Sequence, residues 1–129
     1  IKYRKFLKKI YQSNLKELID NKIIKLQETN KKFYSSEYIF TILLNKKKIN
    51  FTRDDIINYL KKNKINTTVH YIPANKHKFY RNKFKKFNLK NSDYVYENIL
   101  SLPYNNFMSK SDVIYICKHI KKFILKNQK

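Results

Sequence analysis

The chain has 129 residues, a formal net charge of +21 and 42% hydrophobic residues. This length corresponds to one domain, and the apolar content is too high for an intrinsically disordered chain. No apolar run reaches the roughly 18 residues that a membrane span needs. Because the chain has no glycine, it also has no glycine-rich phosphate-binding loop.

The positive charge comes almost entirely from lysine, because arginine occurs only at positions 4, 53 and 81. Bidentate recognition of bases and phosphates favours arginine, and the lysines are spread along the whole chain instead of clustering on one element. Lys, Asn, Ile, Tyr and Phe dominate, and mutational bias in an A/T-rich genome would produce this composition without any ligand. We therefore interpret the charge as a solvated surface, with binding to a polyanion as the alternative.

The first predicted element is a helix over residues 1–20, whose apolar side chains recur at helical spacings and lie on one face. After a polar link, residues 35–44 are rich in β-branched and aromatic side chains, which predicts a buried strand. Thr52 and Asp55 have the spacing of a capping box, so a helix should begin there. We expect this helix to end at Asn63, as a left-handed cap.

The second half of the chain contains shorter elements and a final long helix. They are a strand, two short helices, a strand and an amphipathic helix, over residues 67–71, 77–84, 92–98, 99–103 and 109–126. Pro73 should end the first of these strands, and Asn91 or Ser92 should cap the second short helix. Ser109 and Asp112 repeat the capping-box pattern at the start of the long helix. Three strands with helices on one face make an α+β sandwich.

The histidines and the cysteine are poorly placed for metal binding or nucleophilic chemistry. The histidines at positions 70, 77 and 119 lack the i, i+4 helical spacing of common metal sites, so we predict no metal site. The single cysteine, Cys117, lies on an apolar helical face and should be a small buried side chain. One cysteine cannot form an internal disulfide, which is compatible with a cytoplasmic location.

The candidate binding residues lie at the end of the predicted strand over residues 67–71. His70 and Tyr71 come directly before Ile72-Pro73, and functional groups concentrate where side chains emerge beside loops. The alternative is that Tyr71 packs against the core and His70 forms a local hydrogen bond. Arg81, in the short helix that follows, is either an anion contact or a surface cation.

Several motifs follow one another in an informative order: YRKFLKKIYQSNL, SSEYIFTILL, TRDDIINYLKKNKI, VHYIP, FYR and LSLPYNNFMSKSDVIYICKHI. Together they resemble the C-terminal part of the pyridoxal-phosphate (PLP)-dependent nucleotide-sugar aminotransferases of the DegT/StrS group. VHYIP and FYR most resemble the branch that aminates a UDP-4-keto-6-deoxy-sugar in the pseudaminic acid pathway. The resemblance covers essentially the whole chain.

The resemblance implies a small three-stranded antiparallel sheet flanked by helices, the C-terminal small domain of a fold-type I PLP aminotransferase. Residues 1–20 would be the helix that links two domains, and residues 35–126 the αβ sandwich. The large domain, which carries the Schiff-base lysine and binds PLP, would be missing, so we expect no catalytic residue and no activity in this chain alone. His70 and Tyr71 would bind the substrate, and Arg81 its diphosphate.

The whole enzyme would transfer an amino group from glutamate to a keto nucleotide-sugar, as a cytoplasmic homodimer without membrane or nucleic-acid contacts. Three positions depart from the family pattern, because Tyr38, Lys64 and Asn75 stand where the family has histidine, glycine and histidine. Drift under the A/T bias and loss of activity would each explain these departures. The remaining alternatives are a stand-alone basic nucleic-acid-binding module and a degenerate, non-catalytic homologue.

Overall fold

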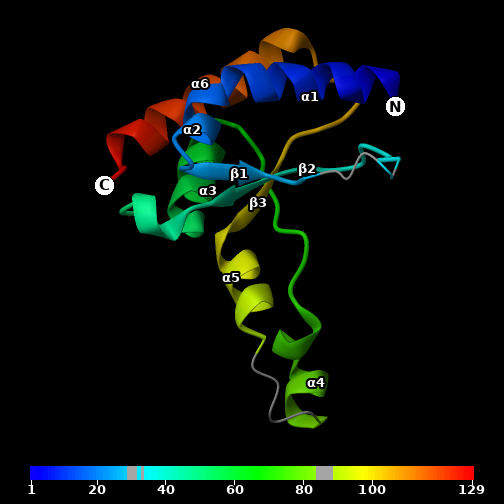
Figure 1. Cartoon of the computed structure of the whole chain (residues 1–129), viewed down its shortest axis with the longest axis vertical. Helices are drawn as coiled ribbons and strands as arrows, with labels where there is room; N and C mark the ends of the chain where they lie inside the picture. The colour runs from blue at the N-terminus through cyan, green and yellow to red at the C-terminus, as the bar shows by residue number, and fades with distance from the viewer. Residues whose placement is uncertain (29–31, 33, 84–88) are drawn as a thin grey trace.

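The computed structural model of the chain describes residues 1–28, 32, 34–83 and 89–129. In this part, a layer of helices covers a small sheet, and a helical extension points away from the sheet (Figure 1). The helices are α1 (Lys2–Asn14), α2 (Lys16–Asp20), α3 (Arg53–Lys62), α4 (Lys78–Lys83), α5 (Lys90–Asn98) and α6 (Lys110–Lys126). The strands are β1 (Ile24–Leu26), β2 (Phe40–Leu44) and β3 (Ile99–Leu102), and the 3-10 turns are η1 (Lys46–Lys48) and η2 (Ala74–Lys76).

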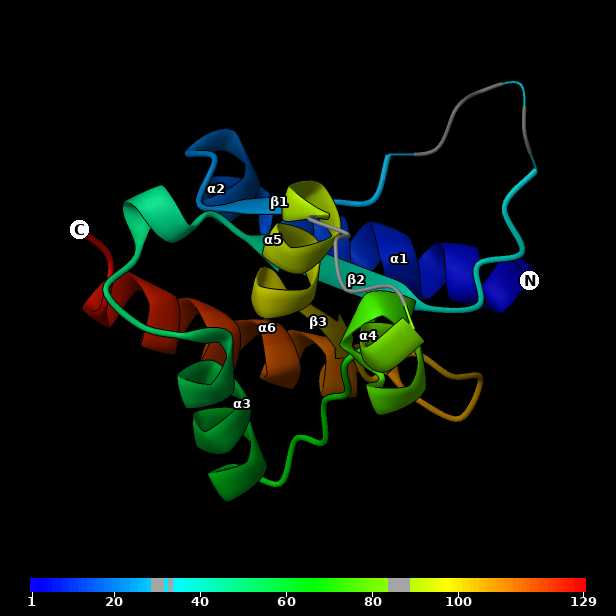
Figure 2. The ribbon, with the colours of Figure 1, turned by 90° about the horizontal axis from the view of Figure 1, so that it is seen from below.

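The sheet is antiparallel in the order β1–β2–β3, which confirms the predicted α+β class and the small three-stranded sheet. Side chains alternate along β2, so Phe40, Ile42 and Leu44 are buried while Thr41 faces the opposite side. The buried face is covered by α1 and α6, which lie against each other. Figure 2 shows the same layers from below.

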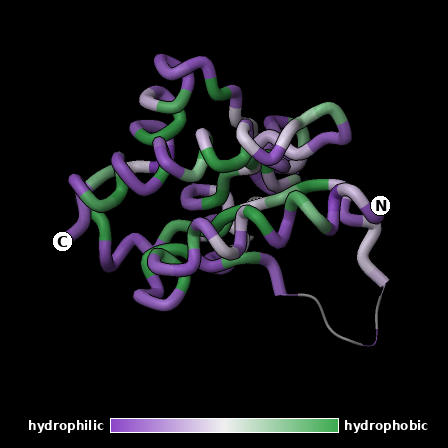
Figure 3. Tube along the Cα trace, turned by 90° about the horizontal axis from the view of Figure 1, so that it is seen from above, coloured by the Kyte–Doolittle hydropathy of each residue, from purple (hydrophilic) through white to green (hydrophobic). Residues whose placement is uncertain are grey.

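The core lies between the sheet and these two helices. Tyr11 of α1 stacks on Phe40 with ring centroids 4.6 Å apart, and its hydroxyl donates to the Pro103 carbonyl at 2.7 Å. Cys117 of α6 is fully buried, as predicted, and burial raises the pKa of its thiol to about 12. Apolar and hydrophilic residues alternate along the helices (Figure 3), and no helix of the described part is long and apolar enough to cross a membrane.

Both predicted capping boxes are confirmed. The Thr52 hydroxyl accepts the Asp55 N–H at 3.2 Å, while the Asp55 carboxylate accepts the Thr52 N–H at 2.7 Å. Ser109 and Asp112 repeat this pair of bonds at the start of α6. Hydrogen bonds from the cap residues hold the pKa of each aspartate below its usual value.

The predicted strand over residues 67–71 is wrong, because only Thr68 pairs there, in an isolated bridge with Ser101 of β3. Beyond this bridge the pairing cannot extend to Asn66, because Pro103 would stand opposite it and has no N–H to donate. The third strand is instead β1, in a stretch expected to be a polar link. It pairs with β2 from Ile24 opposite Leu44 to Leu26 opposite Ile42, and the Ile23 carbonyl accepts the Asn45 N–H at 2.9 Å beside this ladder.

The predicted N-terminal helix over residues 1–20 is divided into α1 and α2. Ser13 and Asn14 both donate side-chain hydrogen bonds to the Ile10 carbonyl, at 3.0 and 2.9 Å. Such side-chain bonds compete with the backbone ladder and favour a break at the next residue, Leu15.

The two short helices also differ from their predicted bounds. The helix expected from residue 92 begins earlier, at Lys90, and Leu89 precedes it without a side-chain cap, so Asn91 and Ser92 are helical rather than caps. The predicted helix over residues 77–84 is observed as α4, but its predicted last residue lies outside the described residues.

Lysine occupies the left-handed position after two helices. Lys64 has a φ of 60°, whereas Asn63, the predicted left-handed cap, has a φ of −95°. The Ile65 N–H donates to the Leu60 carbonyl at 2.9 Å, and the Lys64 N–H to the Lys61 carbonyl at 3.0 Å. This is a Schellman motif, in which glycine is the usual left-handed residue. Lys64 is also the position at which the resembled family has glycine.

The same arrangement ends α2. Lys22 has a φ of 55°, and the Ile23 N–H donates to the Leu18 carbonyl at 2.9 Å. A side chain with a Cβ is unfavourable in this conformation by about 1–2 kcal/mol. The chain therefore tolerates strain at both turns because it has no glycine.

We expect Lys64→Gly to increase the free energy of unfolding by about 1 kcal/mol. Glycine relieves the strain of the left-handed φ, and this gain is partly offset because glycine also increases the entropy of the unfolded chain. Urea unfolding monitored by circular dichroism measures this change. The matched control is Lys61→Gly, the same replacement within α3, which should decrease stability by about 0.5–1 kcal/mol. Equal effects of the two replacements would contradict the assignment of strain to Lys64.

His119 of α6 lies in an aromatic cluster with Tyr59 of α3 and Tyr115 of α6. Its Nδ1 is 3.2 Å from the Tyr59 hydroxyl, and its ring centroid is 4.5 Å from that of Tyr115. Burial lowers the pKa of His119, and the positive charges of Lys122 and Lys118 lower it further. Protonation of this side chain is therefore less favourable in the folded state than in the unfolded state.

This difference predicts a loss of stability in mild acid. The contribution of His119 is fully present above its unfolded pKa of about 6.5 and is lost as the pH falls below that value, because the unfolded chain then binds the proton first. Urea unfolding at about pH 7.5 and about pH 5 should show a smaller loss for His119→Gln than for the unchanged chain. The same loss in both proteins would show that other groups cause the pH dependence.

Candidate functional site

The structure places His70 and Tyr71 side by side beyond the Thr68–Ser101 bridge. Nδ1 of His70 lies 2.8 Å from the Ser101 hydroxyl, and its ring meets that of Tyr71 edge-on with centroids 4.6 Å apart. His70 is half-buried, whereas Tyr71 is 69% exposed. His70 therefore has its closest hydrogen-bond partner on strand β3 rather than a local one, and Tyr71 does not pack in the core.

Two cavities meet at His70. One has a volume of about 340 Å³, and we call it the Arg4 pocket. It is lined by Arg4 of α1, Tyr38 before β2, Asn66, Thr68, and residues of β3 and the loop after it, including Ser101 and Tyr104. The other, of about 350 Å³, lies toward α5 and is lined by residues that include Tyr71, Pro73, Val95 and Tyr96; we call it the Tyr71 pocket. His70 is thus a wall shared by both cavities.

Arg81 lies apart from this pair. It belongs to α4, which forms the far end of the helical extension in Figure 1, and its side chain is exposed. Arg81 lines neither the Arg4 pocket nor the Tyr71 pocket. The structure therefore brings together two of the three predicted binding residues and leaves the third at a distance along the extension.

Arg4 and Glu37 are the charged groups that act on Tyr104 in the Arg4 pocket. The Tyr104 hydroxyl donates to the Arg4 carbonyl at 2.6 Å, and burial raises the pKa of Tyr104 to about 12; the charge of Glu37 raises it further and that of Arg4 opposes the rise. Tyr104 therefore stays neutral near neutral pH. The Glu37 carboxylate is paired with Lys8 at 3.0 Å, so the uncompensated charge beside the pocket is that of Arg4.

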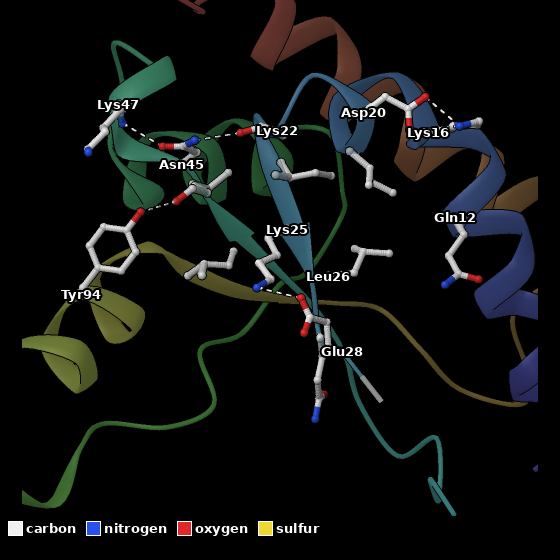
Figure 4. A pocket seen from close by; sticks show the side chains of 15 residues that line it. Gln12, Lys16, Asp20, Lys22, Lys25, Leu26, Glu28, Asn45, Lys47 and Tyr94 are labelled. Atoms are coloured by element: carbon white, nitrogen blue, oxygen red, sulfur yellow. Dashed lines mark hydrogen bonds and ion pairs between the residues drawn. The ribbon is translucent and has the colours of Figure 1, made fainter. Parts of the chain in front are cut away.

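A larger cavity, of about 910 Å³, is an open groove along the edge strand β1 (Figure 4). Its floor includes Ile24 and Leu26, and its rim carries several exposed lysines. Sequence reasoning missed this groove because the three residues of β1 give no strand signal.

The residues described here do not fit PLP by themselves. In the large groove, Lys16 pairs with Asp20 at 2.7 Å and Lys25 with Glu28 at 2.8 Å. Both lysines lie on the exposed rim, so their amines are not enclosed by the protein. Burial is what commonly prepares a lysine for Schiff-base chemistry. In the described ranges there is likewise no group of three metal-ligating side chains.

The chain matches a family model over residues 1–121, that of the DegT/DnrJ/EryC1/StrS aminotransferase family. It is 37% identical over 93 residues to the protein MJ1066 of Methanocaldococcus jannaschii, covering 70% of this chain and 24% of that protein. It is 30% identical over 90 residues to the spore coat polysaccharide biosynthesis protein SpsC of Bacillus subtilis, covering 67% and 23%.

Solved structures agree with this match. Helicobacter pylori PseC, an aminotransferase involved in the biosynthesis of pseudoaminic acid, superposes with a TM-score of 0.83 at 25% identity, over 97% of this chain and 33% of PseC. The aminotransferase TlmJ of Streptoalloteichus hindustanus gives 0.80 at 19% identity, over 95% and 31%, and supports the fold. A Streptococcus pneumoniae protein, Spr1654, matches in its PLP and PMP forms with a TM-score of 0.80 at 24% identity, over 97% and 31%.

The fold is therefore that of a small domain shared with PLP-dependent aminotransferases. The chain belongs to the DegT/DnrJ/EryC1/StrS aminotransferase family, which confirms the resemblance drawn from its motifs. It spans about a quarter of the length of the curated relatives that it matches.

The bond between His70 and Ser101 predicts a measurable effect at the site. Ser101→Ala should lower the free energy of unfolding by about 1 kcal/mol and change the tautomer populations of His70, because the buried hydroxyl that contacts Nδ1 is lost. Urea unfolding and imidazole ¹⁵N chemical shifts measure the two effects. Ser36→Ala, at an exposed position, is the control and should change neither quantity.

Proposed function

We propose that this chain is the C-terminal small domain of a longer PLP-dependent sugar aminotransferase. The observation that carries the proposal is the superposition of 97% of the chain on one third of PseC, together with the family match over residues 1–121. The helix α1 would link this domain to a large domain, which would hold PLP and the Schiff-base lysine. PLP supplies the electron sink in such enzymes, and this chain supplies one wall of the substrate cleft.

The whole enzyme would move an amino group from glutamate to the keto group of a nucleotide-linked sugar in surface-glycan or nonulosonic acid biosynthesis. His70 and Tyr71 would hydrogen-bond the sugar or its phosphates, which is supported by their position beside two adjoining cavities. Arg81 would contact the diphosphate from the extension. We further propose that the enzyme is a cytoplasmic homodimer.

The second candidate is a basic nucleic-acid-binding module, which the net charge of +21 favours. Binding of DNA or RNA measured over a range of salt concentrations separates the two proposals. Tight, sequence-selective binding with a steep salt dependence would support the nucleic-acid module, whereas weak, unselective binding would be the expected behaviour of a solvated lysine surface.

The first test of the aminotransferase proposal is the genomic sequence directly upstream of Ile1. We expect an open reading frame that continues into a large domain with a candidate Schiff-base lysine. An in-frame stop codon immediately before this chain would contradict the proposal.

With the full-length protein and PLP, glutamate and a UDP-4-keto-6-deoxy-sugar should yield the amino sugar. His70→Asn should then raise the KM for the sugar nucleotide by about tenfold, the effect of losing one hydrogen bond to a charged group. His77→Asn, at an exposed position outside both cavities, is the matched control and should stay within about twofold of the unchanged enzyme. An unchanged KM in His70→Asn would remove His70 from the substrate site.

A further inference from the structure

Arg4 has donors to spare beside a cavity. Its Nη1 donates to the Glu37 backbone carbonyl at 3.3 Å, its guanidinium lies 5.8 Å from the centroid of the Tyr38 ring, and its buried Nε has no hydrogen-bond partner in the described residues. Arg53, by contrast, forms an ion pair with Asp54 at 2.9 Å. A guanidinium carries five N–H donors in a fixed fork, so that of Arg4 keeps donors available for an acceptor in the pocket.

The groups around Arg4 complement this donor. His70 uses Nδ1 for Ser101, which leaves Nε2 as its second hydrogen-bonding atom, and Asn66 and Thr68 add polar side chains to the wall. Among the described residues, no carboxylate lines the Arg4 pocket. The acid beside it, Glu37, is engaged by Lys8 at 3.0 and 3.1 Å.

We propose that the Arg4 pocket binds a small oxyanion, a carboxylate or a phosphate group, held by the Arg4 guanidinium and the His70 imidazole. The cavity of about 340 Å³ is at the lower end of the range for ligand sites, which suits a single anionic group or a small acid rather than a whole nucleotide-sugar. Charge-assisted bonds from a guanidinium fork to a carboxylate or phosphate are the strong polar contacts that such a site requires. The inference rests on the pocket itself and does not require aminotransferase activity.

The test is a titration of the isotope-labelled chain followed by NMR. Inorganic phosphate and glutarate are added separately at constant ionic strength, so that a general response to salt is held fixed. We expect saturable binding of at least one anion, with the largest shifts at the His70 ring and the Arg4 side chain. Saturation by phosphate alone or by glutarate alone identifies which oxyanion the pocket accepts.

A high positive net charge attracts anions everywhere, so the variants are matched in charge. Arg4→Gln and Lys9→Gln each remove one positive charge from α1, but Lys9 is exposed and outside the pocket. Arg4→Gln should weaken binding about tenfold, while Lys9→Gln should weaken it less than about twofold. Arg4→Lys keeps the charge, loses the fork and should bind with intermediate affinity.

Thermal unfolding of each variant shows whether it remains folded. The NMR chemical-shift changes of the unsubstituted chain on anion addition test the site independently of any substitution. Equal weakening by Arg4→Gln and Lys9→Gln would mean that anions respond only to net charge and would overturn the proposal. Non-saturable shifts spread over the lysine surface, with none at His70, would overturn it as well.

Discussion

The central strand β2 is the element on which the remaining structure depends. It pairs with β1 on one side and with β3 on the other, and its buried side chains form the floor of the core beneath α1 and α6. In the register with β3, Thr41 lies opposite Ser101, whose side chain contacts His70. A slip by one residue would turn Ser101 into the core, so the same pairing that builds the core also positions the site.

The absence of glycine is the second constraint, and the helix ends show how the fold meets it. In both Schellman motifs the carbonyls at the helix end find donors, although a lysine must adopt a left-handed φ. At the end of α3, Leu60 and Ile65 are both buried, which supplies the apolar contact that accompanies this motif. Packing and hydrogen bonds therefore outweigh local strain, and a composition skewed toward a few residue types changes the stability of these turns without changing their geometry.

The features predictable from the sequence were those with strong local signals. Capping boxes, the amphipathic α6 and the buried β2 each rest on a periodicity or a fixed spacing, and each is observed. The failures have non-local causes. Strand β1 exists through its pairing with β2, and of residues 67–71 only Thr68 pairs with β3, opposite Ser101.

The candidate site was predictable only in part, for the same reason. His70 and Tyr71 are adjacent in the sequence, and their position before Pro73 marked them as a pair. Arg4 is far from them along the chain, and nothing in its local sequence indicates that it shares a cavity with His70. Only the packing of α1 against the sheet brings these two side chains to one pocket.

The hydrogen bonds between α1 and the loop after β3 explain why the Arg4 pocket is preformed. The hydroxyls of Tyr3 and Tyr11 donate to the carbonyls of Met108 and Pro103, both at 2.7 Å, and Tyr104 donates back to the Arg4 carbonyl at 2.6 Å. These bonds cross between the two walls in both directions, so α1 cannot tilt away from β3 without leaving polar groups unpaired. If α1 also links two domains, as proposed, a hinge must lie before this helix, and the pocket would move as one body with the small domain when the cleft opens or closes.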